Sequence, residues 1–342
     1  MNGSAKVIVA GAGALGLSTA LALAEAGCEV TVCDPAPDAE NASGVAAGML
    51  APAFETVLDA AGPDQLALLL AARDLWPRLA ARAGVELDRS GAVAVGSDAW
   101  LAKVRAGLTR VGLHGTDLGR SALDALAPGL SETFQGGVMT REDWRIEAVA
   151  ALRALRQAAA AAGVSFLAEA ARDRGAADWL VAATGSAAGL APELAHLSPI
   201  KGHIIRIQME DVGRVSIRGE GAYAVPTAGG LAIGATMEPG VADPTVDPSR
   251  AEPLLAAGAA LFPALTNARF TLAAGVRATT PDGLPMVGAS SEPRVLVAAG
   301  ARRNGWLLAP LVAQLIAACV TGRDPGPYAA RLDPRRFEGR GR

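Results

Sequence analysis

Three glycines and an aspartate near the start of the chain have the types and spacing needed to bind a dinucleotide. The run Gly11-Ala12-Gly13-Ala14-Leu15-Gly16 is a G-x-G-x-x-G pattern, and Asp34 follows 18 residues after its last glycine. In such a run the first glycine allows a tight turn, the second lets backbone N–H groups approach a pyrophosphate, and the third lets a helix pack closely on a strand. The carboxylate of Asp34 can accept hydrogen bonds from both ribose hydroxyls of an adenosine, and its charge disfavours a 2′-phosphate. The pattern therefore predicts an adenine dinucleotide other than NADP.

The elements around this run supply the context that the pattern needs. Residues 6–10 are a short, β-branched apolar run typical of a buried strand, and an alanine- and leucine-rich helical pattern follows until Gly27 ends it. Residues 29–33 read as a second strand that ends directly before Asp34. Strand, glycine run, helix, strand and acid are thus in the order of a βαβ nucleotide-binding unit. An ordinary βαβ unit without a ligand is the alternative.

Two further segments are candidates for ligand contact. Residues 35–52 are rich in small residues, which would let the main chain lie against a flat ligand, and Ser43 could reach a phosphate or a sugar. A flexible loop after a strand is the alternative for this segment. Near the other end of the chain, Arg303 precedes an apolar helical pattern. A helix N-terminus does not favour a cation, so an anionic ligand would explain Arg303.

Composition excludes several classes of function. The chain of 342 residues has a formal net charge of −3 and 19% charged residues, and no basic block favours nucleic acid or an anionic membrane. No G-x-S-x-G nucleophile motif appears. The start of the chain leaves no room for a signal peptide before the first strand, and the longest apolar stretch, 306–320, is too short to span a bilayer. We therefore expect a soluble cytoplasmic protein. The odd number of cysteines and the isolated histidines predict neither a disulfide framework nor a metal site: Cys28, Cys33, Cys319, His114, His196 and His203.

The rest of the chain divides into two kinds of pattern. From Pro199 onward, closely spaced short strands with turn residues between them are typical of an antiparallel sheet. Helices are predicted over residues 64–82, 100–113, 118–130, 146–162, 250–262 and 306–320. Strands are predicted over residues 91–95, 136–140, 164–167, 179–183, 202–208, 215–218, 222–225, 230–234, 270–279 and 295–299. Because 295–299 again resembles a buried parallel strand, the nucleotide-binding domain is expected to be discontinuous.

Several motifs beyond the glycine run resemble those of one enzyme family. The chain is similar to FAD-dependent amine oxidases of the D-amino acid oxidase group, and within it to the glycine oxidase family of thiamine biosynthesis. The motifs span nearly the whole chain, and the last two are much more specific than the glycine run. They lie at residues 11–16, 46–52, 199–202, 234–237, 280–285 and 303–310. The fold implied is α/β (α+β mixed), with a Rossmann-like FAD-binding domain from 1–85, 140–198 and 275–335 and an inserted antiparallel-sheet substrate-binding domain from 86–139 and 199–274.

The resemblance implies a flavin-dependent oxidation of glycine or another small amino acid, such as a D-amino acid or sarcosine. A hydride would pass from the substrate Cα to flavin N5, the imino acid would hydrolyse to the 2-oxo acid, and O2 would be reduced to H2O2. Because the flavin supplies that chemistry, the protein mainly orients the substrate, which explains why no catalytic histidine or glutamate stands out. A role in forming the thiazole of thiamine, non-covalent FAD, and a homo-oligomer, which related oxidases often form, are further implications.

By the same resemblance, three residues are assigned to the substrate. Arg277 and Arg303 would contact it, since guanidinium binds a carboxylate through two parallel hydrogen bonds, and the hydroxyl of Tyr223 would assist. Spacing alone favours an ordinary surface charge for Arg277 and fits an ordinary strand aromatic for Tyr223. The expected FAD contacts are Gly11, Gly13, Ala14, Leu15, Gly16, Asp34, Ala42, Ser43, Ala47, Gly48, Met49, Ala301, Arg302, Asn304, Gly305, Trp306 and Leu307.

The sequence departs from the family pattern at three places. Arg302 stands where an aromatic residue is usual, and Thr227 stands where the family commonly has arginine after Val-Pro. The region between the strands after Gly163 is short, so the adenine-side contact near Ala170 has no firm position. Arg302 either adds positive charge near the pocket or points to solvent, and the first alternative motivates the hypothesis that the site accepts a second carboxylate or a larger acid.

Three alternatives to an oxidase stay open on the sequence. A dehydrogenase of the same fold would pass electrons to an acceptor other than O2. An NAD-binding Rossmann dehydrogenase is compatible with Asp34. A non-enzymatic flavoprotein subunit would bind FAD without being reduced by any amine.

Overall fold

The first βαβ unit lies at the centre of a six-stranded sheet. The computed structural model describes residues 4–338. Strand β1 (Lys6–Ala10) pairs in parallel with β2 (Glu29–Cys33) on one side and with β9 (Trp179–Ala182) on the other. The sheet continues outward to β8 (Ser165–Leu167) beside β2 and to β17 (Val295–Ala299) beside β9, both parallel, and ends at the antiparallel strand β16 (Met286–Ala289). This confirms the expected return of the chain to the first sheet after Gly163 and again at 295–299.

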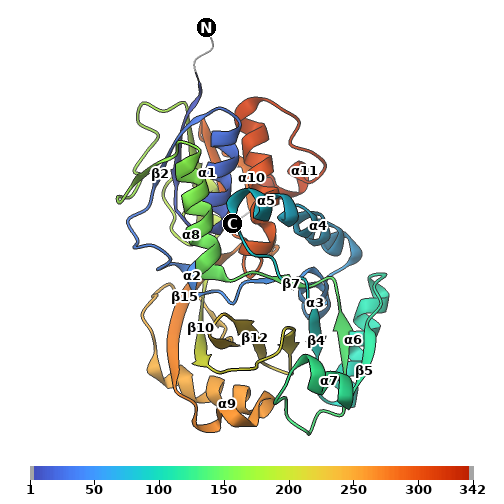
Figure 1. Cartoon of the computed structure of the whole chain (residues 1–342). Coiled ribbons are helices and arrows are strands. Elements are labelled where there is room, and N and C mark those ends of the chain that lie inside the picture. The colour runs from blue at the N-terminus through green and yellow to red at the C-terminus, as the bar shows by residue number, and fades with distance from the viewer. Residues whose placement is uncertain (1–3, 339–342) are drawn as a thin grey trace.

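Three helices build the core beside this sheet. Figure 1 shows α1 (Ala14–Glu25), α8 (Ala148–Ala161) and α10 (Gly305–Thr321) side by side in the same lobe, although α10 is nearly 300 residues from α1 in sequence. Leu17, Leu23 and Leu155 are buried between helices and sheet, with at most 2% of their surface exposed. Burial of each such side chain contributes about 1.5–3 kcal/mol to the free energy of unfolding. Packing of α10 on α1 therefore brings together two segments that are far apart in the sequence.

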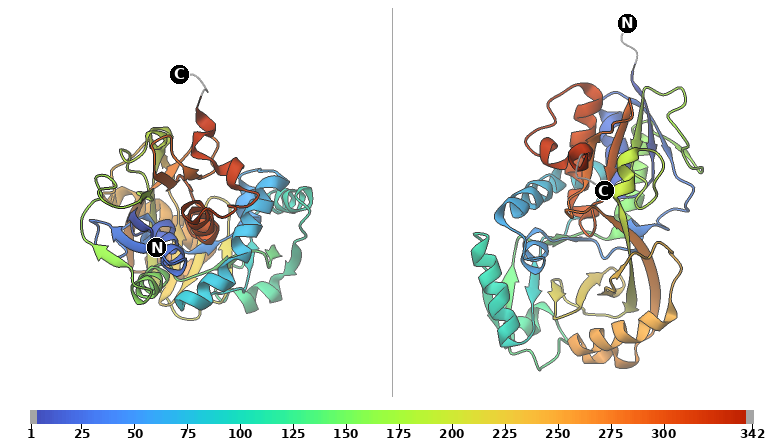
Figure 2. Two further views of the ribbon diagram at one scale, coloured as in Figure 1. Left: turned by 90° about the horizontal axis from the view of Figure 1, so that it is seen from above. Right: turned by 180° about the vertical axis from the view of Figure 1, so that it is seen from behind.

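A second, nine-stranded sheet forms the other lobe (Figures 1 and 2). Its longest strands, β10 (Ser198–Gln208) and β15 (Phe270–Thr279), pair antiparallel over ten residue pairs. The sheet runs on through β13 (Gly230–Gly234), β12 (Tyr223–Thr227), β11 (Ser216–Arg218), β4 (Ala92–Ala94), β6 (Gly136–Thr140) and β5 (Thr116–Gly119), with the short β14 (Glu238–Pro239) also on β10. The predicted antiparallel architecture is confirmed, except that β11 and β4 pair in parallel.

Helices cover the outer side of this second sheet. Helix α9 (Ala251–Leu261) packs on β10, β12 and β13, while α6 (Asp98–Arg110) and α7 (Arg120–Leu126) pack near β6. The buried cluster of this lobe includes Ile205, Ile217, Ile233 and Phe262. The lobe therefore has an apolar core of its own, separate from the core around β1.

Two predicted helices differ from the structure. The single helix expected over 64–82 is two helices, α4 (Pro63–Asp74) and α5 (Trp76–Ala83), because Pro77 lacks an N–H and its ring would clash with a helical carbonyl four residues earlier. The helical region expected over 118–130 begins as strand β5, and α7 occupies only Arg120–Leu126.

The small-residue segment after Asp34 is not simply a loop. It contains α2 (Ala42–Val45), whose N-terminal N–H groups of Ser43 and Gly44 donate to the side chain of Asn41. It ends in β3 (Met49–Leu50), which pairs with β7 (Trp144–Arg145), and leads into α3 (Pro52–Leu58). Sequence reasoning missed α3, β3 and β7, which lie where the two lobes meet (Figure 1).

Between residues 4 and 338, no helix is long and apolar enough to cross a membrane.

Candidate active site

A cavity of about 770 Å³ is lined by residues from both sheets. Its wall includes the glycine run after β1, the segment around α2, the start of α10, and residues of β10, β12 and β15. This volume lies within the range of 300–1,000 Å³ that small-molecule and cofactor sites occupy.

The glycine run has the geometry that its sequence predicts. Gly11 has φ +112°, and a Cβ placed on it would lie 2.3 Å from the carbonyl oxygen of Ala183. Gly16 does not line the cavity; a Cβ there would lie 1.9 Å from the Gly11 carbonyl oxygen, which accounts for its role in close packing. Gly13 has ordinary dihedrals and faces Ser43, whose Oγ would be 3.1 Å from an added Cβ. Gly11 and Gly13 therefore add no side chain of their own at the N-terminus of α1, where Ser43 lies on the side of the cavity.

Polar contacts join the glycine run to the two acceptors predicted for the ligand. The N–H of Ala14 donates to Ser43 Oγ at 3.0 Å, at the first turn of α1. Asp34 Oδ2 accepts the N–H of Ala12 at 2.6 Å, and its Oδ1 accepts the N–H of Ala36 at 2.9 Å. The side chain of Asp34 is thereby oriented at the end of β2, on the cavity wall.

The start of α10 forms another part of the cavity wall. Trp306 donates its indole N–H to the carbonyl oxygen of Ser43 at 3.0 Å, which ties α10 to α2. Arg302 has a positive φ of 50°, which is uncommon for a side chain with a Cβ, and its N–H donates to the Ala278 carbonyl at 2.8 Å. Backbone strain of this kind persists only where the surrounding structure enforces it. Leu307, predicted as a cofactor contact, is fully buried and does not line the cavity.

The other predicted cofactor residues lie on the cavity wall. The structure brings together Gly11, Gly13, Ala14, Leu15, Asp34, Ala42, Ser43, Ala47, Gly48, Met49, Ala301, Arg302, Asn304, Gly305 and Trp306. Ala170, near which the adenine-side contact had no firm position in the sequence, also lines the cavity.

Arg277 is a half-buried cation in β15 whose guanidinium has only neutral partners in the structure. Its Nη2 donates to the carbonyl oxygen of Thr236 at 3.0 Å, and its Nη1 lies 3.4 Å from the sulfur of Met237. Across residues 4–338, no carboxylate forms an ion pair with it. Burial lowers the pKa of Arg277, the expected effect on a cation that is desolvated without a counter-ion. An anionic group of a ligand would supply the missing charge.

Tyr223 lies at the start of β12, opposite Gly234 of β13. Gly234 makes room for it, because a Cβ there would lie 2.4 Å from the tyrosine hydroxyl. Burial raises the pKa of the Tyr223 hydroxyl, against the opposing charges of Arg277 and Arg218. A neutral hydroxyl is thus available as a hydrogen-bond donor beside the cation of Arg277.

Arg303 and Arg302 pair with the carboxylates of Glu55 on α3 and of Asp59, the residue directly after that helix. Arg303 Nη2 lies 2.8 Å from Glu55 Oε2 and 2.6 Å from Asp59 Oδ1, and Arg302 Nη1 lies 2.8 Å from Asp59 Oδ2. The 2.8 Å contact of Arg303 with Glu55 is a close charge pair without hydrogen-bond alignment. Positions 55 and 59 are four residues apart and so lie on one helical face. Arg303 therefore lines the cavity as expected, but it already has two anionic partners.

Sequence reasoning missed Glu55 and Arg218, which form a buried ion pair on the cavity wall. Burial alone would raise the pKa of Glu55, but the charges of Arg218 and Arg303 outweigh burial and hold that pKa below its usual value. Asp143 accepts the N–H groups of Ala53 at 2.8 Å and of Phe54 at 3.2 Å, which fixes the start of α3. In the sequence, the signal for this buried polar cluster is limited to the charged Glu55 that directly follows the apolar pair Ala53-Phe54.

The residues present fit an FAD-type cofactor. Two helices of 12 and 17 residues, α1 and α10, begin at the cavity, and neither has a side-chain hydrogen bond at its N-cap. Such N-termini favour an anion such as a pyrophosphate. Gly48 has φ +80° and a Cβ there would lie 2.1 Å from the Ile146 carbonyl, so this part of the wall is bare backbone. In residues 4–338 no three histidine, cysteine or acidic side chains gather as a metal site would require.

Comparisons with known proteins agree with this geometry. Residues 6–319 match the family model described as FAD dependent oxidoreductase. The glycine oxidase of Pseudomonas putida KT2440 is 30% identical, over 95% of this chain and 98% of that protein. The bifunctional protein ThiO/ThiG of Trichormus variabilis is also 30% identical, over 97% of this chain, but the chain spans only 55% of that protein. Among solved structures, glycine oxidase from Geobacillus kaustophilus has a TM-score of 0.87 and 27% identity, covering 98% of this chain and all of that one.

Proposed function

Because the chain belongs to the FAD-dependent oxidoreductase family, we propose that it oxidises glycine or another small amino acid, such as sarcosine or a D-amino acid, and uses O2 as the electron acceptor. The likeness in sequence and fold to glycine oxidases supports this proposal. The imino acid formed would hydrolyse to the 2-oxo acid with release of ammonia, or of methylamine from sarcosine, and O2 would be reduced to H2O2 as it takes the two electrons of the substrate.

The observation that carries the proposal is Arg277. This arginine is half-buried on the cavity wall, and its guanidinium has only neutral partners. A substrate carboxylate would restore charge balance there through two parallel hydrogen bonds. An amine without a carboxylate could not, so recognition of the carboxylate at Arg277 favours an amino acid as the substrate.

The other residues of the site orient the substrate and hold its surroundings. Bound FAD would accept a hydride from the substrate Cα. The neutral hydroxyl of Tyr223 would donate to the carboxylate beside Arg277. Glu55 and Asp59 keep Arg303 and Arg302 paired, which leaves Arg277 as the anion receptor. Residues Gly13 to Leu15 and Asn304 to Trp306 would hold the cofactor through the N-termini of α1 and α10.

FAD is proposed to be held without a covalent bond. Of the cysteines and histidines of the chain, only Cys33 lies on the cavity wall, and it directly precedes Asp34, at the end assigned to adenosine rather than to the flavin ring. Acid denaturation of the purified protein should release all of the yellow cofactor into the filtrate. Colour that stays with the precipitated protein would overturn non-covalent binding.

A place in the formation of the thiamine thiazole is proposed on the resemblance and on the similarity to the bifunctional ThiO/ThiG proteins. Expression of this chain should restore growth without thiamine to a strain that lacks its glycine oxidase. The Arg277→Met variant should not restore it, and equal growth with both proteins would contradict the proposal.

The activity is tested by anaerobic spectroscopy of the purified holoenzyme with glycine, sarcosine and D-alanine in turn. Bleaching of the flavin band, followed by its return with H2O2 when air is admitted, is the expected result. Bleaching that reverses only with an artificial acceptor would instead identify a dehydrogenase. A flavin band that none of the three amino acids bleaches would contradict the proposed substrates.

A further inference from the structure

An irregularity in the second sheet lies directly beside Arg277. Gly234 of β13 pairs with Ile204 of β10, and Glu238 of β14 pairs with Lys201 of the same strand. The three residues between Gly234 and Glu238, 235–237, therefore lie opposite only two residues of β10, 202 and 203. This is the arrangement of a β-bulge, which inserts one extra residue and redirects neighbouring groups. We call residues 235–237 the bulge.

The side chain of Thr236 replaces a backbone contact that the bulge disrupts. The N–H of His203 on β10 donates to Thr236 Oγ1 at 2.8 Å rather than to a carbonyl of the neighbouring strand. The N–H of Thr236 donates in turn to the His203 carbonyl at 3.2 Å. The hydroxyl donates its own proton to Glu238 Oε1 at 2.7 Å. One hydroxyl thus closes the gap in the ladder that the extra residue leaves.

The carbonyl oxygen of Thr236 is the group that the bulge makes available. It accepts a hydrogen bond from Nη2 of Arg277 at 3.0 Å. The guanidinium reaches this oxygen across Gly202, where an added Cβ would lie 1.7 Å from Nη2 and 2.8 Å from the Thr236 oxygen. Met237, the next residue of the bulge, contacts Nη1 at 3.4 Å. Both terminal nitrogens of Arg277 are thus located by the bulge.

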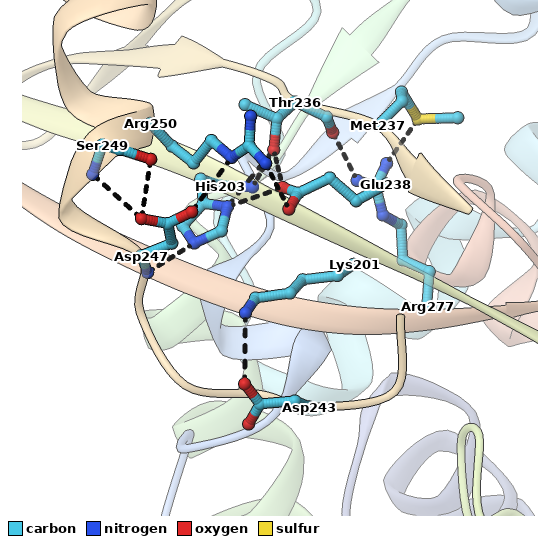
Figure 3. Close-up of polar contacts among 10 residues, drawn as sticks. All are labelled: Lys201, His203, Thr236, Met237, Glu238, Asp243, Asp247, Ser249, Arg250 and Arg277. Atoms are coloured by element: carbon cyan, nitrogen blue, oxygen red, sulfur yellow. Dashed lines mark hydrogen bonds and ion pairs between the residues drawn. The ribbon is translucent and has the colours of Figure 1, made fainter. Parts of the chain in front are cut away.

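His203, on β10, has its ring between Glu238 and Asp247 and so links the bulge to the segment that follows β14 (Figure 3). Its ring is fully buried, and its Nε2 accepts the N–H of Asp247 at 3.0 Å, so the ring proton is on Nδ1. Nδ1 lies 2.9 Å from Glu238 Oε1 and donates to it. Arg250 also pairs with Glu238, at 3.5 Å. Burying the His203 ring is costly unless both of its nitrogens have partners, so this arrangement of the ring is specific.

We propose that Thr236 is a positioning residue for the substrate. Its hydroxyl, held by His203 and Glu238, fixes its own carbonyl against Arg277, so that the guanidinium is held toward the substrate carboxylate. The inference rests on the proposed function, in which Arg277 binds that carboxylate. Thr236 touches neither the reacting atoms nor the carboxylate, and it acts through Arg277.

The test is a titration of the purified FAD-loaded enzyme with acetate, a carboxylate without an amine, followed through the change in the flavin spectrum. Thr236→Val removes the hydroxyl and keeps the shape of the side chain. It should weaken acetate binding about tenfold, because the buried N–H of His203 and the half-buried carboxylate of Glu238 both lose a partner. Thr236→Ser restores the hydroxyl and should bind acetate within about threefold of the wild type, since its hydrogen bonds are kept. The matched control is Thr266→Val, whose hydroxyl bonds the Pro263 carbonyl outside the site, and it should bind acetate normally.

The outcomes separate this inference from the proposed function. Arg277→Lys should bind acetate more weakly than Thr236→Val does; if Arg277→Lys binds it like the wild type, or if the wild type shows no response to acetate, both proposals are wrong. If Arg277→Lys loses acetate but Thr236→Val keeps it, only the positioning role is wrong. The positioning role is equally contradicted if Thr236→Val loses FAD in parallel with acetate, or if Thr236→Ser is as weak as Thr236→Val.

Discussion

Asp59 should control whether the site distinguishes one carboxylate from two. Its two oxygens neutralise Arg303 at 2.6 Å and Arg302 at 2.8 Å, although Asp59 itself does not line the cavity. In Asp59→Asn, Arg303 keeps Glu55 as a partner, whereas Arg302 loses its only ion pair within residues 4–338. The side chain of Arg302 lies on the cavity wall and would then be open to a second carboxylate of a ligand.

The size of the effect follows from the exposure of the pair. A hydrogen bond between charged groups contributes about 1.5–3 kcal/mol when well buried. The side chains of Arg302 and Asp59 are 30% and 21% exposed, so solvent screening reduces the gain. We expect about 1–1.4 kcal/mol, which is roughly five- to tenfold in affinity for the dicarboxylate.

Malonate and acetate serve as probes that differ by one carboxylate. Each is titrated into the FAD-loaded wild type and Asp59→Asn, and the ratio of the two dissociation constants is compared. The ratio should shift five- to tenfold toward malonate in Asp59→Asn. The matched control is Asp117→Asn, which breaks a surface ion pair with Arg105 and should leave the ratio unchanged. An unchanged ratio in Asp59→Asn, or a shift toward acetate, would refute the reasoning.

Three further predictions concern the cofactor cradle, the support of α3 and the room for Arg277. Gly13→Ala should fold but bind FAD at least tenfold more weakly in equilibrium dialysis, because its methyl group would enter the anion site beside Ser43. The matched control is Gly119→Ala, which lies at a helix N-cap with similar dihedrals and open space around it, and this variant should bind FAD normally. Equal FAD affinity of the two variants would contradict the assigned site. Burial raises the pKa of Asp143 to about 7, so the folded protein binds this proton more tightly than the unfolded chain, and the stability that results is lost as the pH rises from about 4 to 7. Urea unfolding of Asp143→Asn should therefore show stability rising relative to the wild type over that range, by up to about 4 kcal/mol, and parallel pH profiles would show that Asp143 is ionised throughout. Gly202→Ala should weaken acetate binding at least tenfold without loss of FAD, because its Cβ would displace the Arg277 guanidinium, and normal acetate binding would show that the guanidinium has another stable position.

The nucleotide-binding half of the site could be predicted from sequence because its residues are local. The glycine run, the first helix and Asp34 lie within about 30 residues, and their order alone fixes one βαβ unit. The return of the chain at 295–299 was also readable, because a buried parallel strand is a continuous apolar run. The apolar pattern over residues 306–320 likewise predicted α10, which begins at Gly305 on the cavity wall.

The substrate half depends on contacts that sequence spacing does not reveal. Glu55 and Arg218 are 163 residues apart, and neither has a local pattern that distinguishes it from a surface charge. The bulge depends on how β10 pairs with β13 and β14, and the apolar pattern of β10 does not show where its two partner strands are out of register with each other. For Arg302 the sequence allowed either an added charge near the pocket or a side chain in solvent, whereas its partner Asp59 directly follows α3, a helix that sequence analysis missed.

The central claim is that Arg277 selects amino acids through their carboxylate, and anaerobic flavin reduction by D-alanine and by ethylamine tests it most directly. Ethylamine is D-alanine without its carboxylate, so the ratio of the two reduction efficiencies measures carboxylate recognition alone. The wild type should prefer D-alanine by a factor of at least a hundred, the value expected for about 3 kcal/mol from a charged, two-bond contact. Arg277→Met should lose most of that preference while it keeps its FAD. A variant that still prefers D-alanine as strongly as the wild type would contradict the account.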